Sequence, residues 1–339
     1  MVNKVKSSLE KGKKDMPKYK NPLQQPLFTP DSSWMIPEVL PDLSKAKEIC
    51  IDLETWDPNL KEKGSGWARK DGHIVGIALA TEGWQGYFPV RHRSGGNLDE
   101  KLVFNWLKEM LSTNSDKICH NASYDIGWLK AEGIEAKGRI IDTMVAAPLI
   151  DENRFSYSLN ALGRHYLQES KNEELLNDAA EAWNVDSKSG LSELPPMYVG
   201  PYAEQDAALT LRLWKHFKTE LSKQDLWSIF NLESSITPLL IEMRMRGVRI
   251  DLERAEEMSK KFHAKEMEAL HKIKQLVGSE VEIWANASIE KAFKKLNLPY
   301  NFTEKGSPSF QQIWLEEHKH EFPQLIVKAR KMNKARTTF

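Results

Sequence analysis

The succession of strand-like and helix-like segments between residues 48 and 225 constrains the fold of this chain more than any other feature. Several short segments alternate apolar and polar side chains, which is the pattern of strands that lie half-buried in a sheet. Glu82-Gly83 separates two of these segments and is typical of a hairpin turn. The expected strands are residues 48–55, 73–81, 83–90 and 116–121, and residues 139–150 are expected to run from a strand into a helix.

Helical periodicity fills the intervals between these strands and dominates after them. We expect Asn97 to cap the first helix, and the prolines near residue 195 to break the entry into the last one. The expected helices are residues 98–113, 122–133, 158–168, 172–183 and 194–221. Three strands, a helix, a strand and then mostly helices predict an α/β fold in which helices cover a mixed sheet.

Composition divides the chain into three parts. Residues 1–44 are rich in lysine and then in proline, which predicts an irregular extension lying over the body. After residue 225 the pattern becomes almost wholly helical, with Gly247 and Gly278 as natural helix stops. We therefore expect an extension at 1–44, an α/β domain at 45–225 and a helical segment at 226–339.

The neutral total charge conceals two basic ends. Residues 1–20 and the last sixteen residues each carry a net charge of +5, which leaves residues 21–323 at −10. Each end is a candidate for phosphate contact, with a solvated tail or helix face as the alternative. Neutrality of the whole chain therefore does not argue against nucleic-acid binding.

Four carboxylates and one tyrosine stand out by their placement. Asp52 and Glu54 are two residues apart in an apolar strand, so both side chains point to the same face. Asp125 lies near the start of a helix that follows a strand. Tyr202 and Asp206 are four residues apart on a helix and are therefore neighbours on one face. Two like charges on one strand face repel unless a cation lies between them, so the pattern indicates a cation site.

The chemistry of this set favours divalent metals. Mg²⁺ and Mn²⁺ are hard cations that prefer oxygen ligands, and two such ions can activate water and stabilise a leaving oxygen during phosphodiester cleavage. Tyr202, whose unperturbed pKa is near 10, suits orienting the attacking water better than removing its proton. The expected cofactor is a pair of Mg²⁺ or Mn²⁺ ions.

The motifs CIDLET, HNASYDIGWL and YAEQDAALT resemble the three exonuclease motifs of the proofreading domain of family A DNA polymerases. That domain is a DnaQ-like (RNase H-like) 3′→5′ exonuclease with a tyrosine in its third motif. The resemblance covers roughly residues 45–225 and implies that Asp52, Glu54, Asp125 and Asp206 bind the metals. It also implies that Tyr202 orients the nucleophile and that Thr55 and Asn121 contact the substrate. A further matching segment contains Asp142, which is expected to be structural.

The helical tail extends the resemblance. Residues 284–310 resemble the segment that leads into the polymerase thumb, and residues 325–339 resemble its next, phosphate-contacting helix. Nothing in the sequence resembles the palm aspartates or the fingers helix. The expected chain is thus an exonuclease with the first part of a thumb and without polymerase activity of its own.

Three functional hypotheses follow. The first is a metal-dependent 3′→5′ exodeoxyribonuclease acting on single-stranded or frayed DNA, with release of nucleoside 5′-monophosphates. The second is an exoribonuclease of the same superfamily. The third is a scaffold role as one piece of a split polymerase that positions a separate palm-and-fingers subunit, and a fragment of a longer polymerase would end the same way.

The cellular location is predicted from what the sequence lacks. No apolar run approaches the ~18 residues of a membrane span, and the lysines near the start precede no apolar stretch of a secretory signal. Cys50 and Cys119 both lie in apolar runs, as in proteins of a reducing compartment. We expect a cytoplasmic protein of a bacterial or phage-infected cell, with DNA as partner and no membrane.

Overall fold

A five-stranded mixed sheet is the centre of the first of two compact units in the computed structural model, which describes residues 26–338. The strand order is β3-β2-β1-β4-β5. The three strands at one side are antiparallel neighbours, whereas β4 and β5 run parallel to β1. The strands are β1 (Glu48–Trp56), β2 (His73–Thr81), β3 (Trp84–Pro89), β4 (Asp116–Cys119) and β5 (Ile140–Asp142). The predicted α/β fold with a helix-covered mixed sheet is confirmed.

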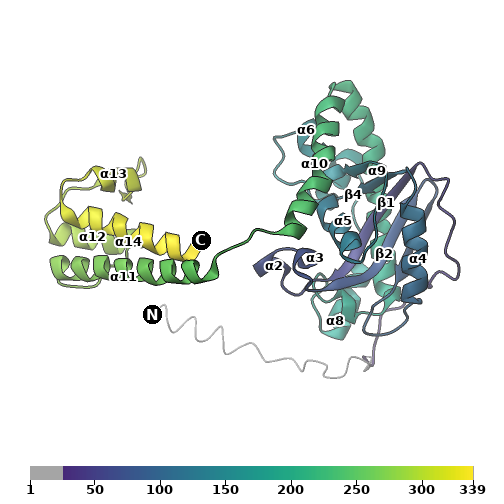
Figure 1. Ribbon diagram of the computed structural model, residues 1–339, viewed down its shortest axis with the longest axis horizontal. Coiled ribbons are helices and arrows are strands. Elements are labelled where there is room, and N and C mark those ends of the chain that lie inside the picture. The colour runs from purple at the N-terminus through teal and green to yellow at the C-terminus, as the bar shows by residue number, and fades with distance from the viewer. Residues whose placement is uncertain (1–25, 339) are drawn as a thin grey trace. The chain divides into compact units, whose positions relative to one another are not determined.

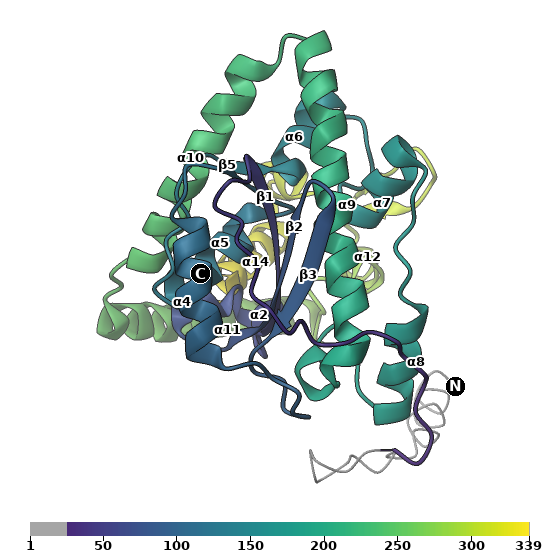
Figure 2. The same cartoon turned by 90° about the vertical axis from the view of Figure 1, so that its right-hand side faces the viewer.

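Helices lie on both faces of this sheet, as Figure 2 shows with α9 on one side and α4 and α5 on the other. The alternation of β1 separates two cores: Cys50 packs on the α9 side, and Ile51 and Leu53 pack on the α4 and α5 side. The helices of the unit are α2 (Leu60–Lys63), α3 (Gly66–Arg69), α4 (Glu100–Leu111), α5 (Ala122–Ala131), α6 (Thr143–Ile150), α7 (Leu159–Leu162), α8 (Glu174–Trp183), α9 (Pro196–Lys223) and α10 (Trp227–Arg246). Two short turns, the π-helical Gly163–Leu167 and the 3₁₀ Leu191–Glu193, complete it.

The expectation for the cap of α4 is wrong. Asp99 is the N-cap, and its carboxylate accepts a hydrogen bond of 2.8 Å from the amide of Leu102. The Asn97 side chain instead exchanges two hydrogen bonds with the backbone of His92. Because the Asn97 side chain is engaged by the preceding loop, it is not available as a cap, and the carboxylate two residues later takes that position.

The entry into α9 is continuous rather than broken by its prolines. Pro196 occupies the first turn, where no backbone donor is needed, and Pro201 lies inside the helix. Pro201 has no amide to offer the carbonyl of Met197, and that carbonyl accepts a hydrogen bond of 2.8 Å from the Ser32 hydroxyl instead. The described part of the N-terminal extension therefore lies over the body, as expected, and compensates α9 where proline disrupts its hydrogen bonding.

The second compact unit, Val248–Phe339, has a core of its own. Its long helices α11 (Leu252–Val277) and α14 (Glu321–Thr338) lie side by side in Figure 1. The smaller elements are α12 (Asn286–Lys295), β6 (Asn301–Phe302), β7 (Pro308–Ser309) and α13 (Gln312–Glu317). The division between the units follows Gly247, later than the expected 225/226 boundary, because α10 packs against α5, α6 and β5 of the first unit.

No helix in the described residues is both long and apolar enough to cross a membrane.

Candidate active site

Strand β1 directs two carboxylates toward α9. Asp52 and Glu54 share the strand parity of Cys50, which belongs to the core on the α9 side, so both side chains point to that face. Directly after Glu54 the pairing of β1 with β2 shifts register. Such a bulge re-aims the following side chain, and Thr55 thereby reaches the pocket beside Glu54.

Helix α9 supplies the partners of these carboxylates. Asp206 is only 5% exposed, and the apolar residues one, two and three turns further along the same face are buried with it. Tyr202 lies one turn earlier and lines the pocket. The prediction that Asp206 points inward is confirmed.

Asp125 reaches the same region from the start of α5. Strand β4 pairs with β1 only along residues 48–50, so the amide of Leu53 has no strand partner on that side. The Asp125 carboxylate accepts a hydrogen bond of 3.1 Å from that amide. This contact places Asp125 between the positions of Asp52 and Glu54 along β1.

The mutual repulsion of these groups is visible in their pKa values. Burial, followed by the charge of Asp206, raises the pKa of Asp52 to about 7. Burial and then the charges of Asp52 and Asp206 raise the pKa of Glu54 well above its ordinary range. Burial and then Asp52 do the same for Asp125. The charge of Asp52 thus acts on both Glu54 and Asp125, and that of Asp206 acts on Asp52 and Glu54.

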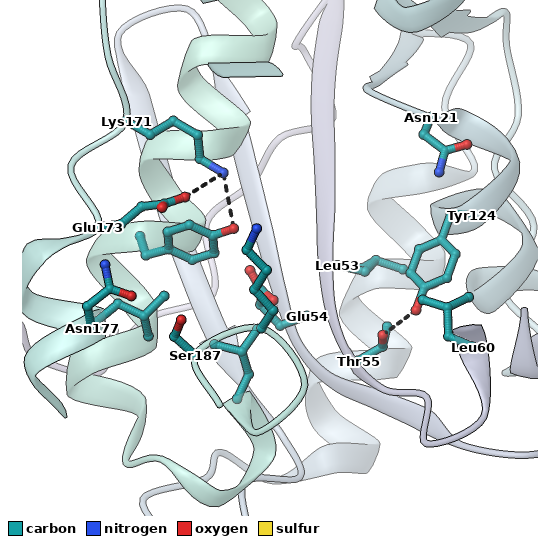
Figure 3. Close-up of a pocket in the computed structure, with 14 residues that line it drawn as sticks. Leu53, Glu54, Thr55, Leu60, Asn121, Tyr124, Lys171, Glu173, Asn177 and Ser187 are labelled. Carbon is teal, nitrogen blue, oxygen red and sulfur yellow. Dashed lines mark hydrogen bonds and ion pairs between the residues drawn. The ribbon is translucent and has the colours of Figure 1, made fainter. Parts of the chain in front are cut away.

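A lysine that the sequence reasoning did not single out lies among them. The Lys171 ammonium forms an ion pair with Asp206, donates a hydrogen bond of 3.1 Å to the Tyr202 hydroxyl and lies 3.6 Å from Glu173. Figure 3 shows the last two of these contacts at one side of the pocket. Lys171 lies in an irregular segment with no periodicity, so no sequence signal points to it.

The pocket between these side chains has a volume of about 420 Å³. Glu54, Thr55, Asn121 and Tyr202 line it, together with residues that the sequence reasoning missed. The missed lining residues are Leu53, Leu60, Tyr124, Lys171, Glu173, Leu176, Asn177, Ser187, Lys188 and Leu191. Asp52, Asp125 and Asp206 are not part of the lining; Asp125 and Asp206 are buried, whereas Asp52 is partly exposed.

Two hydrogen-bond systems fix the far side of the pocket, and Figure 3 shows the first of them, between Thr55 and Tyr124. The hydroxyls of Thr55 and Tyr124 are 2.7 Å apart. Asn121 has a left-handed backbone conformation, with φ of 75°, and its backbone N–H donates to the carboxylate of Asp142. Asp142 also accepts from the amides of Ala122 and Met144, which caps α5 and α6 together. The expected structural role of Asp142 agrees with these bonds.

The chemistry of the carboxylate donors suits a hard divalent cation, although their arrangement does not form a metal site. The Oδ1 atom of Asp206 is buried and has no hydrogen-bond partner, which leaves one carboxylate oxygen available to a cation. In the part of the chain that the structure describes, however, no three His, Cys, Asp or Glu side chains lie close enough together to hold one metal ion. The Lys171 ammonium holds the other oxygen of Asp206.

Comparison with known proteins identifies the family of the chain. A family model described as a 3′-5′ exonuclease matches residues 32–222. A DNA-directed DNA polymerase of Pseudomonas phage M6 is 37% identical over 328 residues, covering 94% of this chain and 49% of its own length. DNA polymerase I of Pseudomonas aeruginosa is 26% identical, over 88% of this chain and 33% of its own length. The chain spans about half the length, or less, of these relatives.

The solved structures add a likeness of fold. The POL domain of Pol1 from M. smegmatis, in complex with DNA primer-template and dNTP, matches with a TM-score of 0.67 at 18% sequence identity. The match covers 87% of this chain and 46% of that one. On the family match and the phage relative, the chain belongs to the 3′-5′ exonuclease family of the family A DNA polymerases.

Proposed function

We propose that this chain is a divalent-metal-dependent 3′→5′ exodeoxyribonuclease that removes nucleotides from single-stranded or frayed DNA ends. The observation that carries the proposal is the placement of Asp52 and Glu54 on the face of β1 toward α9, which carries the inward-pointing Asp206, beside a pocket that Glu54 and Tyr202 line. Two bound Mg²⁺ or Mn²⁺ ions would activate water and stabilise the leaving oxygen of the phosphodiester.

Residues of the chain would position the attacking water, the terminal nucleotide and the metal ions. Burial raises the pKa of Tyr202 far above its ordinary value, so the phenol stays protonated and orients the attacking water as a hydrogen-bond donor. Thr55 and Asn121, which line the pocket opposite Lys171, are proposed to contact the terminal nucleotide. The four carboxylates are proposed to be the metal ligands, with the unpartnered Oδ1 of Asp206 as one donor atom.

The remaining parts of the chain are assigned by the same reasoning. We propose that residues 45–225 carry the nuclease activity and that residues 226–339 correspond to the start of a polymerase thumb. The proposed partner is DNA, and the proposed location is the cytoplasm of a bacterial or phage-infected cell. The relatives' greater length supports a separate or continuing palm-and-fingers part as a further proposed partner.

Degradation of a 5′-labelled single-stranded oligonucleotide in Mg²⁺ tests the proposal. We expect a ladder of products shortened from the 3′ end, its abolition by EDTA, and a loss of about 10²–10³-fold in Asp52→Ala and Asp206→Ala. Glu109→Gln, an exposed carboxylate on α4, is the control. Full activity in either aspartate variant would overturn the proposal, and faster degradation of RNA of the same sequence would favour the exoribonuclease hypothesis.

A further inference from the structure

The position of Lys171 is the feature that the proposed reaction leaves unexplained. Its side chain is 10% exposed and that of Asp206 is 7% exposed, so their ion pair is largely shielded from solvent. The ammonium also lies 4.4 Å from the centre of the Tyr202 ring. Lys171 therefore contacts two of the residues that the proposed reaction requires, and it does so in the place where a cation is expected.

The backbone around Lys171 is held against α9. The amide of Asn172 donates to the Gln205 side chain at 2.9 Å, and the Arg212 guanidinium pairs with Glu169 at 2.6 Å. The amide of Lys171 itself donates to the side chain of Asn160 at 3.2 Å. These bonds hold the segment against the helix that carries Asp206. The position of Lys171 beside Asp206 is therefore fixed by the backbone on both sides of it.

Charge explains why a lysine is tolerated there. Burial opposes the charged form of Lys171, but the carboxylate of Asp206 and then that of Asp52 raise its pKa above the ordinary value. Without a cation, the carboxylates around Asp206 would face one another unneutralised. The ammonium supplies one positive charge to the set and holds one of the two carboxylate oxygens of Asp206.

We propose that Lys171 is an internal cation that competes with the divalent metal for Asp206 and thereby sets the metal affinity of the site. This inference rests on the proposed metal-dependent function. For the metal to take both oxygens of Asp206, the ammonium has to leave that carboxylate. Glu173, 3.6 Å from the ammonium at the edge of the pocket, is the partner to which it can turn (Figure 3).

Binding of Mn²⁺, measured by the loss of the free-ion electron paramagnetic resonance signal, tests the proposal without reference to activity. Removing a competing like charge from a shielded site is expected to tighten Mn²⁺ binding at least about tenfold in Lys171→Met. Lys171→Gln is expected to do the same, whereas Lys171→Arg retains the charge and should stay near the parent affinity.

A matched control separates competition at Asp206 from the effect of removing any positive charge near the pocket. Lys188 lines the same pocket, is exposed, and forms no ion pair with any residue among 26–338. Lys188→Met removes an equal charge, and we expect it to change Mn²⁺ affinity by less than about threefold because solvent screens it. Equal effects of the two methionine variants would contradict competition at Asp206.

Thermal unfolding in EDTA supplies a second readout. Loss of the internal cation leaves the carboxylates unneutralised, so Lys171→Met should melt lower than the parent in EDTA and recover part of the difference in saturating Mn²⁺. Unchanged or weaker Mn²⁺ binding in both neutral variants, with circular dichroism showing an intact fold, would overturn the inference. That result is distinct from failure of the proposed function, in which Asp52→Ala would keep full nuclease activity.

Discussion

A single carboxylate, that of Asp142, determines the backbone beside the pocket. It accepts three backbone hydrogen bonds, from Asn121, Ala122 and Met144, at 2.7 to 2.9 Å. These bonds hold Asn121 in a left-handed conformation, which ordinary side chains adopt at a cost. The position of the proposed substrate contact thus depends on a residue that does not line the pocket.

Asp142→Asn tests this dependence. The amide group keeps one acceptor oxygen and turns a nitrogen donor toward backbone donors, so we expect a loss of about 2 kcal/mol of unfolding free energy. Urea unfolding measures it, and Asp178→Asn, an exposed aspartate on α8, is the control. A variant as stable as the parent would show that the three bonds contribute little.

The direction of a site side chain could be predicted from the sequence where the periodicity of a strand or helix determines the face to which it points. Strand alternation placed Asp52 and Glu54 on one face, and helix spacing placed Tyr202 beside Asp206. Lys171 could not be predicted, because its contact with Asp206 joins an irregular segment to a helix through tertiary packing alone. The metal ligation and the role of each site residue stay predictions.

At the scale of elements, the N-terminal extension and α9 are coupled at the helix proline. The Ser32 hydroxyl satisfies the Met197 carbonyl that Pro201 leaves without a donor, and the Trp34 indole donates to Glu204 at 2.9 Å on the same helix. The sequence predicted an extension lying over the body. It could not predict this compensation, because the donor and the proline are far apart in the chain.

Ser32→Ala is expected to destabilise the first unit by about 1–3 kcal/mol, since it leaves a carbonyl without its partner. Urea unfolding followed by tryptophan fluorescence is the measurement. Ser33→Ala removes the neighbouring, exposed hydroxyl and should stay within about 0.5 kcal/mol of the parent. Equal stability of the two variants would indicate that water satisfies the Met197 carbonyl.

A buried histidine links the end of β3 to the turn before α9. The Nδ1 atom of His92 lies 2.8 Å from the carbonyl of Leu194 and must donate to it, so in the neutral ring Nε2 accepts from the Tyr87 hydroxyl at 2.7 Å. Burial lowers the pKa of His92 from 6.5 to about 4. Between these values the unfolded chain binds the extra proton and the folded chain does not.

The contribution of His92 to stability is therefore fully present above pH 6.5 and is lost as the pH falls toward 4. From about pH 7.5 to about pH 5 the expected loss from this one group is about 2 kcal/mol. Urea unfolding at both pH values should show a smaller pH dependence in His92→Gln than in the parent. His165→Gln, an exposed histidine, should keep the parent dependence, and an unchanged slope in His92→Gln would refute the assignment.

At the scale of the whole molecule, the structure bears on only one of the two basic ends that are candidates for phosphate contact. The N-terminal run lies outside the described residues. In the C-terminal run, several basic side chains are engaged within their own unit: Lys328 with Glu268, Arg330 with the carbonyls of Ile283 and Phe310, Lys331 with Glu316, and Arg336 with Glu266. Much of the +5 of that run is thus neutralised locally, which weakens the argument from charge alone that this helix contacts phosphate.

The division of the chain was only partly accessible from the sequence. The strands and their sheet followed from alternation and turn residues, and the change to a helical pattern near residue 225 is real. Composition does not reveal which core a helix joins, so α10 was placed with the tail although it packs on the first unit. The boundary of the nuclease domain at 225 stays a prediction, and the family match ends nearby at residue 222.

The two units are expected to fold independently, because each buries a separate apolar core. Residues 247–250 between them are exposed and have no helical or strand structure, and Arg246 and Arg249 offer trypsin two cleavage sites there. Among the described residues, limited trypsin digestion should therefore cut first at this segment, giving one fragment that ends near residue 249 and one that begins near residue 250. Mass spectrometry identifies the fragments.

Calorimetry on the separated fragments completes this test. If each core is sufficient, each fragment keeps a cooperative thermal transition, and the larger one keeps the nuclease activity because every proposed site residue precedes Gly247. Replacing both arginines by glutamine should remove the early cleavage without moving either transition. Loss of the cooperative transition in the larger fragment after cleavage would show that its fold depends on the second unit.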